Sequence, residues 1–473
     1  NNCILFIMSY ANVLVFRGMN QTYTYIIENT DDYYPGLHVD VPFGKAVVGG
    51  VILDVFESNN FSTIPIKPIN GITIKKPNLS PTLLDLIQWF WQTYNLTPYK
   101  AYQTIVGNRK YRELDTTESP IEFNCPYNLN SSQESIINTI QQYNHYHKFL
   151  IHGVTGSGKT EIYMQLAAQT IKQHKTALIL VPEIALTPQF RETFEGRFGT
   201  QVTVIHSGMT PKQREVNWNA VNQGKVSIVI GPRSAVFSPL SNIGLIVIDE
   251  EHDDSYKQDT HPRYRTHTVA EYRAKTHHCP LILGSATPAI DTYFHYENGQ
   301  SKTVKNTNDS TILTLKNRVH NTALPTVTIV DMQEQWMSQK RHLISTDLEG
   351  AIEKRLKHSE KTLLLLNRRG FAPYVICQKC AKPFSCPECN LSYTYHKDKT
   401  FRCHRCHTFT PMTHTCPSCK KPTLSFTGTG TQKLEVELLK RFPHAKISRL
   451  DRDSAKTAKQ METILEEFKS SGD

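Results

Sequence analysis

The sequence predicts an α/β protein with two parallel-sheet lobes, preceded by a small β domain and a winged-helix-like unit, and three observations support this fold class. From about residue 123 onward, strands rich in Ile, Leu and Val alternate with stretches of helix length. Such continuous apolar strands are typical of parallel sheets covered on both faces. A glycine-rich turn at residues 153–160 follows one of these strands, and the cysteine-rich stretch 377–419 predicts a separate insert.

Length, charge and cysteine usage narrow the class of protein further. The 473 residues exceed one ordinary core, since domains usually hold about 100–200 residues. The formal net charge of +10 favours a polyanionic partner such as nucleic acid. No apolar run approaches the roughly 20 residues of a membrane span, and the apolar start lacks the flanks of a signal peptide. We therefore expect a cytoplasmic protein without a membrane partner, in which paired cysteines bind metal.

The first part of the chain predicts two small units. Residues 1–72 alternate short apolar strands with turns, as at Pro35 and Gly36, which predicts a β domain. Residues 73–122 change to helical periodicity in PTLLDLIQWFWQTY, followed by a second short helix near YKAYQTIVG. This pattern fits a winged-helix-like unit, and it fits a plain linker domain as well.

Two lobes are expected next. Residues 123–320 carry six apolar strands of a first lobe, namely KFLIHG, TALILVP, VTVIHS, VSIVIG, GLIVIDE and PLILGSA. Residues 321–473 restart the alternation with the strand TVTIVDM, a helix from about Asp347 and the strand KTLLLLNRRG. The cysteine-rich insert, residues 376–421, interrupts this second lobe.

The stretch GVTGSGKT has the pattern of a phosphate-binding loop, and it stands between an expected strand and an expected helix. Its glycines, Gly153, Gly156 and Gly158, let backbone N–H groups face a triphosphate at a helix N-terminus. Lys159 would reach the terminal phosphates, and the Thr160 hydroxyl would ligate Mg²⁺. The motif therefore predicts a nucleotide and Mg²⁺ as cofactors.

A second motif, VIDEEHDD, predicts hydrolysis of that nucleotide. Asp249 and Glu250 end a buried run at the carboxyl end of a strand, where ligands bind in open α/β sheets. Asp249 would hold Mg²⁺ and Glu250 would activate the attacking water. Gln133 could bond an adenine edge through its amide, and the SAT motif, Ser285 to Thr287, offers hydroxyls beside the carboxylates.

The motifs in order resemble those of superfamily 2 DNA helicases: GVTGSGKT, LVPEIALTPQ, IGPRSAVFSP, VIDEEHDDSYKQ, LILGSATP and LLLLNRRGFAP. With HVDVPFGK, FTGTGTQKLEVEL and the cysteine array, the chain is similar to the bacterial primosomal replication-restart helicases over nearly its whole length. The resemblance implies RecA-like helicase lobes and an ATP-driven 3′-to-5′ helicase that recognises stalled or repaired forks. Implied partners are branched and single-stranded DNA, single-stranded-DNA-binding protein and helicase-loading proteins of the primosome.

The resemblance also carries residue roles over by position. The nucleotide and Mg²⁺ residues of the family match Gln133, Lys159, Thr160, Asp249 and Glu250. A position along the DNA backbone matches Thr187. A pocket for a DNA 3′ end matches Tyr23, Phe43, Gly44 and Lys67. A loop that stacks or clamps single-stranded DNA matches Tyr256, Lys257, Gln258, Arg263 and Tyr264.

The chain departs from the family pattern at several places. Thr24 stands where an aspartate is common, which weakens charge-assisted recognition of a 3′ hydroxyl. Pro232 replaces a threonine, and residues 266–268 differ from the common A-R-D. The sequence ends at Asp473, before the motif whose arginine completes the ATP site. Because such an arginine contributes roughly 10³–10⁵ in rate, we expect a fragment or truncated product that binds nucleotide and hydrolyses it poorly.

Eight cysteines in four C-x-x-C pairs predict two structural zinc sites, because four thiolates close a tetrahedral site. The pairs can combine in three ways. The expected hairpin LSYTYHKDKTFRC favours the nested one, since it joins the second pair to the third and an insert returns to its starting point. The family arrangement agrees. The inner site would use Cys386, Cys389, Cys403 and Cys406, and the outer site Cys377, Cys380, Cys416 and Cys419.

The other features of the insert favour a structural role. We do not expect its histidines, His396, His404, His407 and His414, to be ligands. Its side-chain charge of +6 between residues 377 and 421 falls to +2 with two Zn(Cys)₄ centres, so no strong electrostatic grip on DNA follows. Besides a helicase, a double-strand translocase, a non-motor fork-binding scaffold and, more distantly, a zinc oxidoreductase remain as alternatives.

Overall fold

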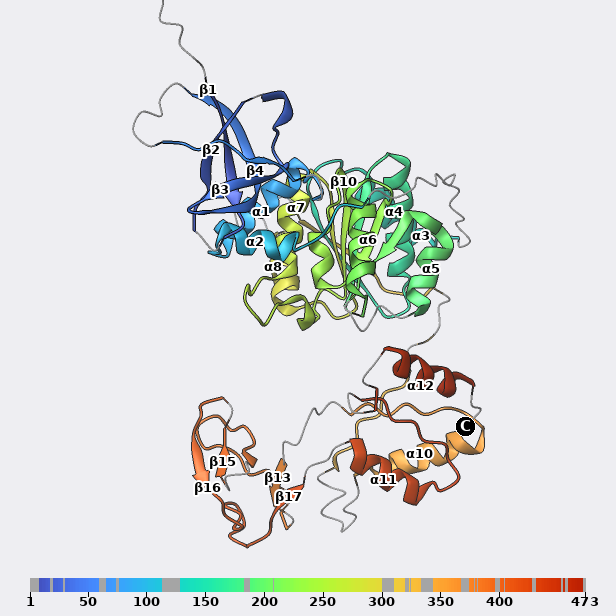
Figure 1. The fold of residues 1–473 in the computed structure, drawn as a ribbon. Coiled ribbons are helices and arrows are strands. Elements are labelled where there is room, and N and C mark those ends of the chain that lie inside the picture. Colours follow the sequence, from blue (N-terminus) through green and yellow to red (C-terminus); the bar gives the residue numbers. More distant parts are fainter. Residues whose placement is uncertain are drawn as a thin grey trace, which may run out of the picture. The chain divides into compact units, whose positions relative to one another are not determined.

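The computed structural model divides the chain into two compact units, Asn1–Ala323 and Leu324–Asp473. Figure 1 shows the helices and strands of both units. The described residues are 8–17, 20–28, 30–58, 65–73, 76–112, 128–182, 188–206, 208–299, 310–319, 323, 325–332, 343–366, 374–377, 379–380, 382–395, 400–403, 405–427, 431–451, 454–455 and 458–470.

The small β domain expected at the start of the chain is a five-stranded sheet in the order β2-β1-β4-β3-β5. Its strands are β1 (Met8–Val15), β2 (Tyr23–Ile27), β3 (His38–Phe43), β4 (Ala46–Ser58) and β5 (Gly71–Ile72), with a 3-10 helix η1 at Thr30–Asp32. The segment before β5 curls the sheet closed, because the Ile26 N–H donates to the Lys67 carbonyl at 3.0 Å and the Asn70 N–H donates to the Asp40 carbonyl at 2.8 Å. Val13, Val39 and Ile52 are fully buried inside it.

Two helices pack against this sheet, α1 (Pro81–Thr93) and α2 (Pro98–Ile105). Each begins with a proline after a capping residue, Ser80 or Thr97, as helix starts favour. Tyr102 of α2 stacks on Phe16 with ring centroids 4.5 Å apart, and its hydroxyl lies 2.8 Å from His38 Nε2. Described residues 76–112 hold no strand, so the two helices of the winged-helix-like unit are present there without a wing.

The first lobe contains a seven-stranded parallel sheet in the order β12-β6-β11-β10-β7-β9-β8, which confirms the predicted architecture. The strands are β6 (Lys148–Gly153), β7 (Thr176–Leu180), β8 (Val202–Val204), β9 (Ile228–Gly231), β10 (Ile243–Asp249), β11 (Leu281–Ser285) and β12 (Ser310–Leu315). The edge strand β12 is additional to the six strands predicted. Apolar alternation in its sequence, STILTL, is the signal that could have found it.

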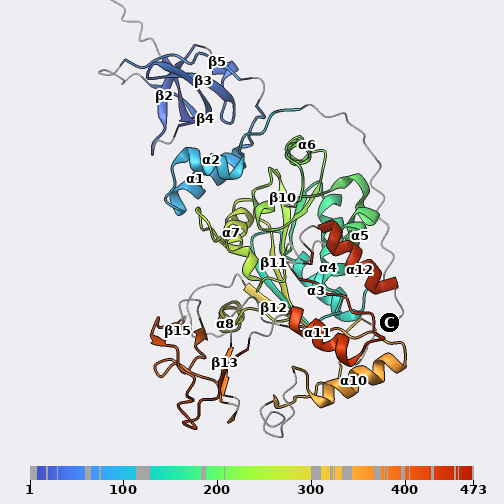
Figure 2. The same ribbon diagram turned by 60° about the horizontal axis from the view of Figure 1, so that its bottom comes forward.

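Helices cover both faces of this sheet (Figure 2). They are α3 (Ser131–Gln141), α4 (Lys159–Lys172), α5 (Pro188–Phe198), α6 (Pro211–Asn222), α7 (Thr266–Thr276) and α8 (Ile290–Gly299), with 3-10 turns η3 (Gly199–Gln201), η4 (Arg233–Phe237) and η5 (Asp254–Tyr256). Leu245 and Val247 of β10 join the core formed with α3, α4 and α5. Ile246 and Ile248 join the core formed with α6 and α7. The strand is therefore apolar throughout, because both of its faces are buried.

The second unit differs from the prediction. Its helices are α10 (Thr346–Lys357), α11 (Thr431–Arg441) and α12 (Ala458–Ser470), which share a small core around Ile352 and Leu438. Described residues 325–331 and 361–366 form no strand, so the parallel sheet predicted for this lobe is absent from the described part of the unit. The physical reason is that a parallel strand needs hydrogen-bonded neighbours, and none flanks these segments among the described residues.

The cysteine-rich insert forms a five-stranded antiparallel sheet in the order β16-β15-β14-β13-β17. Its strands are β13 (Tyr374–Cys377), β14 (Thr394–Tyr395), β15 (Thr400–Arg402), β16 (Phe409–Pro411) and β17 (Leu424–Thr427). The predicted hairpin is the β14–β15 pair, with Thr394 opposite Arg402. β13 and β17 pair where the insert begins and ends, so its two ends are neighbours as expected.

Among the helices of the described residues, none has the length and apolar character that crossing a lipid bilayer requires.

Candidate functional site

The phosphate loop connects β6 to α4 in the conformation that its glycines allow. Gly156 and Gly158 have φ angles of 79° and 82°, in the left-handed region that favours glycine. Gly158 is the N-cap of α4, so the free N–H groups of the first helical turn lie at the loop. Lys159 is 9% exposed, and its Nζ donates to the Gly153 carbonyl at 2.9 Å. The loop therefore holds its own lysine in a position from which it can exchange onto a phosphate.

The register of the sheet brings the other motifs to the same edge. Asp249 at the end of β10 lies opposite Gly284 of β11, and Ser285 lies opposite His152 of β6. Burial and the neighbouring Glu250 carboxylate raise the pKa of Asp249 to about 6, whereas Lys159 acts to lower it. An aspartate this close to a lysine at a phosphate loop has the donor chemistry that a hydrated Mg²⁺ requires.

Two tyrosines hold Asp249 in place. Tyr163 of α4 is fully buried, and its hydroxyl donates to Asp249 Oδ1 at 2.9 Å. The Tyr256 hydroxyl donates to the Asp249 carbonyl oxygen at 2.7 Å. Gly284 leaves the room for this arrangement, since a Cβ atom there would lie 1.7 Å from the Tyr163 hydroxyl oxygen and 3.2 Å from Asp249 Oδ1.

Glu250 is joined to the SAT motif through a histidine. Its φ of 46° is left-handed, and its side chain is 38% exposed at the sheet edge. His252 Nδ1 lies 3.6 Å from Glu250 Oε2 and 2.8 Å from Ser285 Oγ, which also accepts the Thr287 N–H at 2.9 Å. One hydrogen bond, between His252 and Ser285, therefore connects the two motifs, and Glu250 lies at ion-pair distance from the same histidine.

The Gln133 amide already has partners in this structure. The residue is 3% exposed, and its Oε1 accepts the Asn130 N–H at 3.0 Å in a capping box. Its Nε2 donates to the carbonyl oxygens of Ser157 at 3.2 Å and Gly158 at 3.4 Å. The Nε2 end of the amide thus supports the phosphate loop while the Oε1 end caps α3, and the adenine contact stays a prediction that requires these bonds to be exchanged.

The last residue of β12 and the residues that follow it also contact the loop, and the sequence did not predict these contacts. The Val154 N–H donates to the Leu315 carbonyl at 3.2 Å, and the Val319 N–H donates to the Gly156 carbonyl at 3.0 Å. A Cβ atom on Gly156 would lie 3.8 Å from both Cγ and Cδ of Arg318. No motif marks this segment in the sequence, because its place at the loop follows from β12 pairing with β6.

The predicted DNA-contacting loop is anchored by its tyrosines rather than exposing them. Tyr256 is 1% exposed and Tyr264 is 4% exposed, with Tyr264 against Phe237 at a centroid distance of 5.0 Å. Stacking of these two tyrosines on DNA bases does not fit this arrangement, because their rings already lie in the apolar core. The prediction of that role is corrected to one of anchoring.

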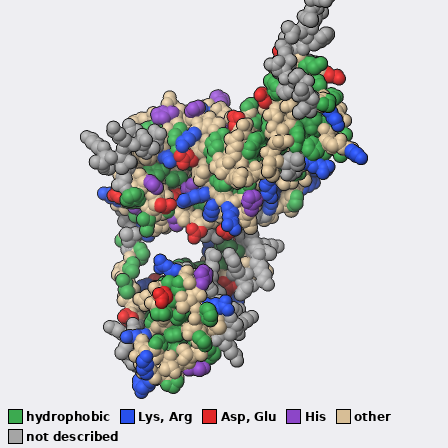
Figure 3. Space-filling view, turned by 90° about the vertical axis from the view of Figure 1, so that its left-hand side faces the viewer, with side chains coloured by type: hydrophobic (Ala, Val, Ile, Leu, Met, Phe, Trp, Pro, Cys, Tyr) green, Lys and Arg blue, Asp and Glu red, His purple; other side chains and the backbone are tan. Residues whose placement is uncertain are grey.

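The cations of the same loop remain at the surface. Lys257 and Arg263 are exposed, and the Lys257 Nζ donates to the Arg263 carbonyl at 2.6 Å. Arg233 of the GPRS motif binds the loop through its Nη1, which donates to the carbonyl oxygens of Ser255 at 2.8 Å and Lys257 at 2.6 Å. On the face drawn in Figure 3, Lys and Arg side chains are spread out rather than gathered in one patch.

The candidate pocket for a DNA 3′ end lies on the N-terminal sheet. The rings of Tyr23 and Phe43 meet edge to face with centroids 5.1 Å apart. Gly44 follows with a φ of 62° and open space where a Cβ would be. Lys67 is exposed and its carbonyl bonds β2, the strand that carries Tyr23 and Thr24. Thr187, predicted to lie along DNA, is outside the described residues.

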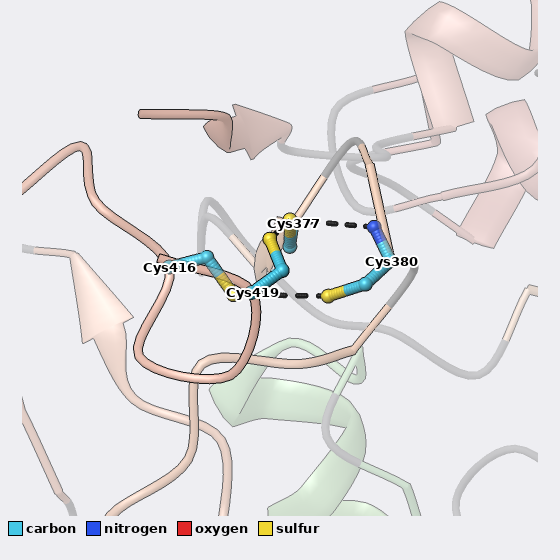
Figure 4. A group of neighbouring side chains, drawn as sticks. All are labelled: Cys377, Cys380, Cys416 and Cys419. Carbon is cyan, nitrogen blue, oxygen red and sulfur yellow. Dashed lines mark hydrogen bonds between the residues drawn. The ribbon is translucent and has the colours of Figure 1, made fainter. Parts of the chain in front are cut away.

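The eight cysteines form two clusters in the predicted nested pairing, and within each cluster the sulfur atoms lie within 4.8 Å of one another. Cys377 Sγ is 3.5 Å from Cys419 Sγ, Cys380 Sγ is 3.7 Å from Cys416 Sγ, and Cys386 Sγ is 3.5 Å from Cys406 Sγ. Figure 4 shows the four outer sulfurs converging from two loops. Tetrahedral zinc thiolates have sulfur separations of about 3.8 Å, so the donor sets fit this metal. Among the described histidines, His407 and His414 belong to neither cluster, and His396 and His404 are outside the described residues.

Sheet, loop and carboxylates together define a helicase-type nucleotide-binding lobe, and the family model described as DEAD/DEAH box helicase matches residues 130–294. A second family model, described as 3′DNA-binding domain (3′BD), matches residues 12–107. That range covers the N-terminal sheet from the middle of β1 onward, together with α1 and α2. The packing of Tyr102 of α2 on Phe16 joins the same two parts.

Relatives identify the family more narrowly. The replication restart protein PriA of Chlamydia muridarum is 36% identical, over 97% of this chain and 72% of the relative. PriA of Rickettsia conorii is 32% identical, over 94% of this chain and 67% of the relative. The chain therefore belongs to the PriA family of replication restart proteins. PriA of Bacillus subtilis is 42% identical over 68% of this chain, and the matched part spans 39% of that relative's length.

Proposed function

We propose that this chain carries the motor of an ATP-dependent 3′-to-5′ DNA helicase that acts at stalled or repaired replication forks and begins replication restart. The observation that carries the proposal is the shared sheet edge, where the phosphate loop, Asp249, Glu250 and the SAT motif meet. PriA family membership supports the same function.

The residues at this edge have distinct roles in the proposal. Gly153, Gly156 and Gly158 shape the loop, and Lys159 leaves the Gly153 carbonyl to bind the terminal phosphates. Thr160 and Asp249 would hold Mg²⁺, which supplies charge neutralisation on the phosphate oxygens. Glu250, exposed at the edge and near His252, accepts the proton of the attacking water. Gln133 keeps the loop in shape and bonds the adenine only after exchanging partners.

DNA would bind at two places in the first unit. The exposed Lys257 and Arg263 contact the phosphate backbone beside Glu250, while Tyr256 and Tyr264 fix the loop that carries them. Tyr23, Phe43, Gly44 and Lys67 receive a strand 3′ end, which the match of residues 12–107 to a 3′DNA-binding domain supports. Thr187 would lie along the backbone. Single-stranded-DNA-binding protein and helicase-loading proteins are the proposed partners, and the cytoplasm is the proposed location.

The cysteine-rich insert would hold two Zn²⁺ ions with structural roles. All four positions of each tetrahedral site are filled by thiolates, which leaves no open position for catalysis. The division into a β domain, a winged-helix-like unit and two lobes belongs to the same proposal.

ATP hydrolysis by the full chain, measured with and without forked DNA, tests the motor. We expect ATP binding that Lys159→Ala abolishes, and slow hydrolysis that Lys159→Ala and Glu250→Gln both abolish, with ATP binding retained in Glu250→Gln. Strand-displacement and triplex-displacement assays then separate a helicase from a double-strand translocase. Unstimulated, Lys159-independent hydrolysis would contradict a motor at this site.

A fork-binding scaffold is the second candidate, because residues 12–107 match a 3′DNA-binding domain that could bind a fork without nucleotide hydrolysis. Equal fork binding by the unmodified chain and by Lys159→Ala, with no hydrolysis in either, would favour the scaffold over the motor.

A further inference from the structure

The turn after β12 brings an arginine and a valine to the phosphate loop. Arg318 lies with its aliphatic stem beside Gly156, and the Val319 N–H bonds the Gly156 carbonyl at 3.0 Å. Arg318 Nε is buried and has no hydrogen-bond partner among the described residues. Val319 is 42% exposed, although it is apolar. A buried Nε without a hydrogen-bond partner is costly unless a ligand satisfies it, and an exposed valine gains from being covered.

The same turn lies beside Gln133. A Cβ atom on Gly158 would be 2.3 Å from Gln133 Nε2 and 2.9 Å from Val319 Cγ2, so both side chains border one point at the start of α4. Gln133 is the residue that the family pattern assigns to adenine, yet its amide is engaged on the loop. On this side of the loop, Val319 is exposed, and the partly buried side chain of Arg318 lies next to it in the chain.

We propose that Arg318 and Val319 form the wall of the ATP site against which the nucleobase packs. This inference rests on the proposed ATP-binding function and adds the residues that hold the base. A planar guanidinium stacks on an aromatic ring, and a valine methyl covers the rest of the ring surface. The phosphates have other partners, the loop N–H groups and Lys159, so the wall serves the base end of the nucleotide.

The wall predicts how the site discriminates between ligands. Stacking is tolerant of base identity, because every base has a π-face. A purine ring is larger than a pyrimidine ring and covers more of the wall, so purine nucleotides should bind more tightly than pyrimidine nucleotides. A ligand without a base should not be affected by Arg318. Inorganic tripolyphosphate is such a ligand, since it keeps the charges that Lys159 and the loop recognise.

Calorimetric titration of the full chain with ATP and with tripolyphosphate tests the wall. We expect Arg318→Ala to weaken ATP binding about tenfold, the loss of one base-stacking contact, and to leave tripolyphosphate binding unchanged. Arg318→Lys should weaken ATP binding nearly as much, because lysine has the positive charge without the planar guanidinium group. Val319→Ser should weaken ATP alone as well, by a smaller factor. Lys316→Ala removes an exposed cation two residues away and should change neither ligand.

Two outcomes would contradict this proposal. Arg318→Ala could weaken the binding of ATP and of tripolyphosphate equally, which would assign Arg318 to the phosphates, or it could leave ATP binding unchanged. Unfolding midpoints equal to that of the unmodified chain show that each variant is folded. Failure of the proposed function would give a different result. The unmodified chain would bind no ATP, or Lys159→Ala would bind ATP as tightly as the unmodified chain.

Discussion

The first lobe and the cysteine-rich insert each contain a β-sheet, but different interactions surround the two sheets. In the first lobe, apolar residues on both faces of each central strand fill two cores against helices. In the insert, a few aromatic and aliphatic side chains surround two clusters of cysteine. A sheet that buries little apolar surface needs another source of free energy, and thiolate–metal bonds at the two cysteine clusters would supply it. The difference predicts that the insert needs bound metal to stay folded, whereas apolar packing alone stabilises the first lobe.

Removal of metal should separate the two regions most strongly. Structural zinc contributes on the order of 10 kcal/mol to small domains, so chelation should unfold the insert and leave ATP binding by the first lobe unchanged. Cys416→Ser should lower the zinc content from two ions to one per chain. Cys279→Ser is the matched control, because Cys279 is a buried thiol of the first lobe outside both clusters. Two bound zinc ions in Cys416→Ser would contradict the assignment.

A single methyl group added at Gly284 should lower the stability of the first lobe. In Gly284→Ala the new Cβ would lie 1.7 Å from the Tyr163 hydroxyl oxygen, so β11 or α4 must move. We expect a loss of several kcal/mol in unfolding free energy, since overpacking commonly costs about 1–3 kcal/mol and the Asp249 contact is lost too. Gly350→Ala in α10 has open space around its Cβ and should be neutral or stabilising. Equal midpoints for both variants in chemical denaturation would refute this view of the sheet.

Acid should destabilise the first unit through buried histidines. Burial, followed by the charge of Lys76, lowers the pKa of His38 to about 4, and burial also lowers those of His267 and His277 to about 4. These groups stay neutral in the folded unit and bind protons more readily when unfolded. Stability is therefore complete above pH 6.5 and falls as pH decreases from 6.5 toward 4, by up to about 3 kcal/mol for each group.

Unfolding midpoints between pH 7.5 and 4.5 measure this loss. His38→Gln removes one titrating group and should reduce the slope of stability against pH, at some cost in stability at pH 7. A slope identical to that of the unmodified chain would show that His38 does not contribute.

Loss of the buried Tyr163 hydroxyl should weaken Mg²⁺ binding more than it weakens nucleotide binding. Tyr163→Phe removes the hydrogen bond that orients the Asp249 carboxylate, and bonds to charged groups contribute roughly 1.5–3 kcal/mol. We expect at least a roughly tenfold higher Mg²⁺ concentration for half-maximal ATP binding, and unchanged ATP binding in EDTA. Tyr296→Phe is the control, because that buried hydroxyl has no hydrogen-bond partner in the described part of the chain. A similar Mg²⁺ dependence for both variants would argue against the Tyr163 role.

The sequence predicts those features that depend on local pattern. The phosphate loop, the carboxylates at the end of β10 and the nested cysteine pairing all follow from residue type, spacing and strand polarity. The neighbours of the loop do not follow, because β12 and Arg318 reach it only through pairing across the sheet. Burial of Tyr256 and Tyr264 was missed for a similar reason: an aromatic residue in a polar loop has the same sequence signal whether it faces solvent or the core.

The smallest change in stability is expected in an apolar run of the second unit. Its composition resembles that of β10, but its side chains are exposed. Ile248 of β10 is fully buried, whereas Leu363 and Leu365 in an equally apolar run are 86% and 91% exposed. Ile248→Ala should cost about 2–5 kcal/mol, as buried aliphatic truncations do. Leu363→Gln and Leu365→Gln should change the unfolding free energy of the full chain by less than about 0.5 kcal/mol, because surface substitutions rarely do more. A loss above 2 kcal/mol in either leucine variant would show that this run is buried in solution and forms the strand that its composition predicts.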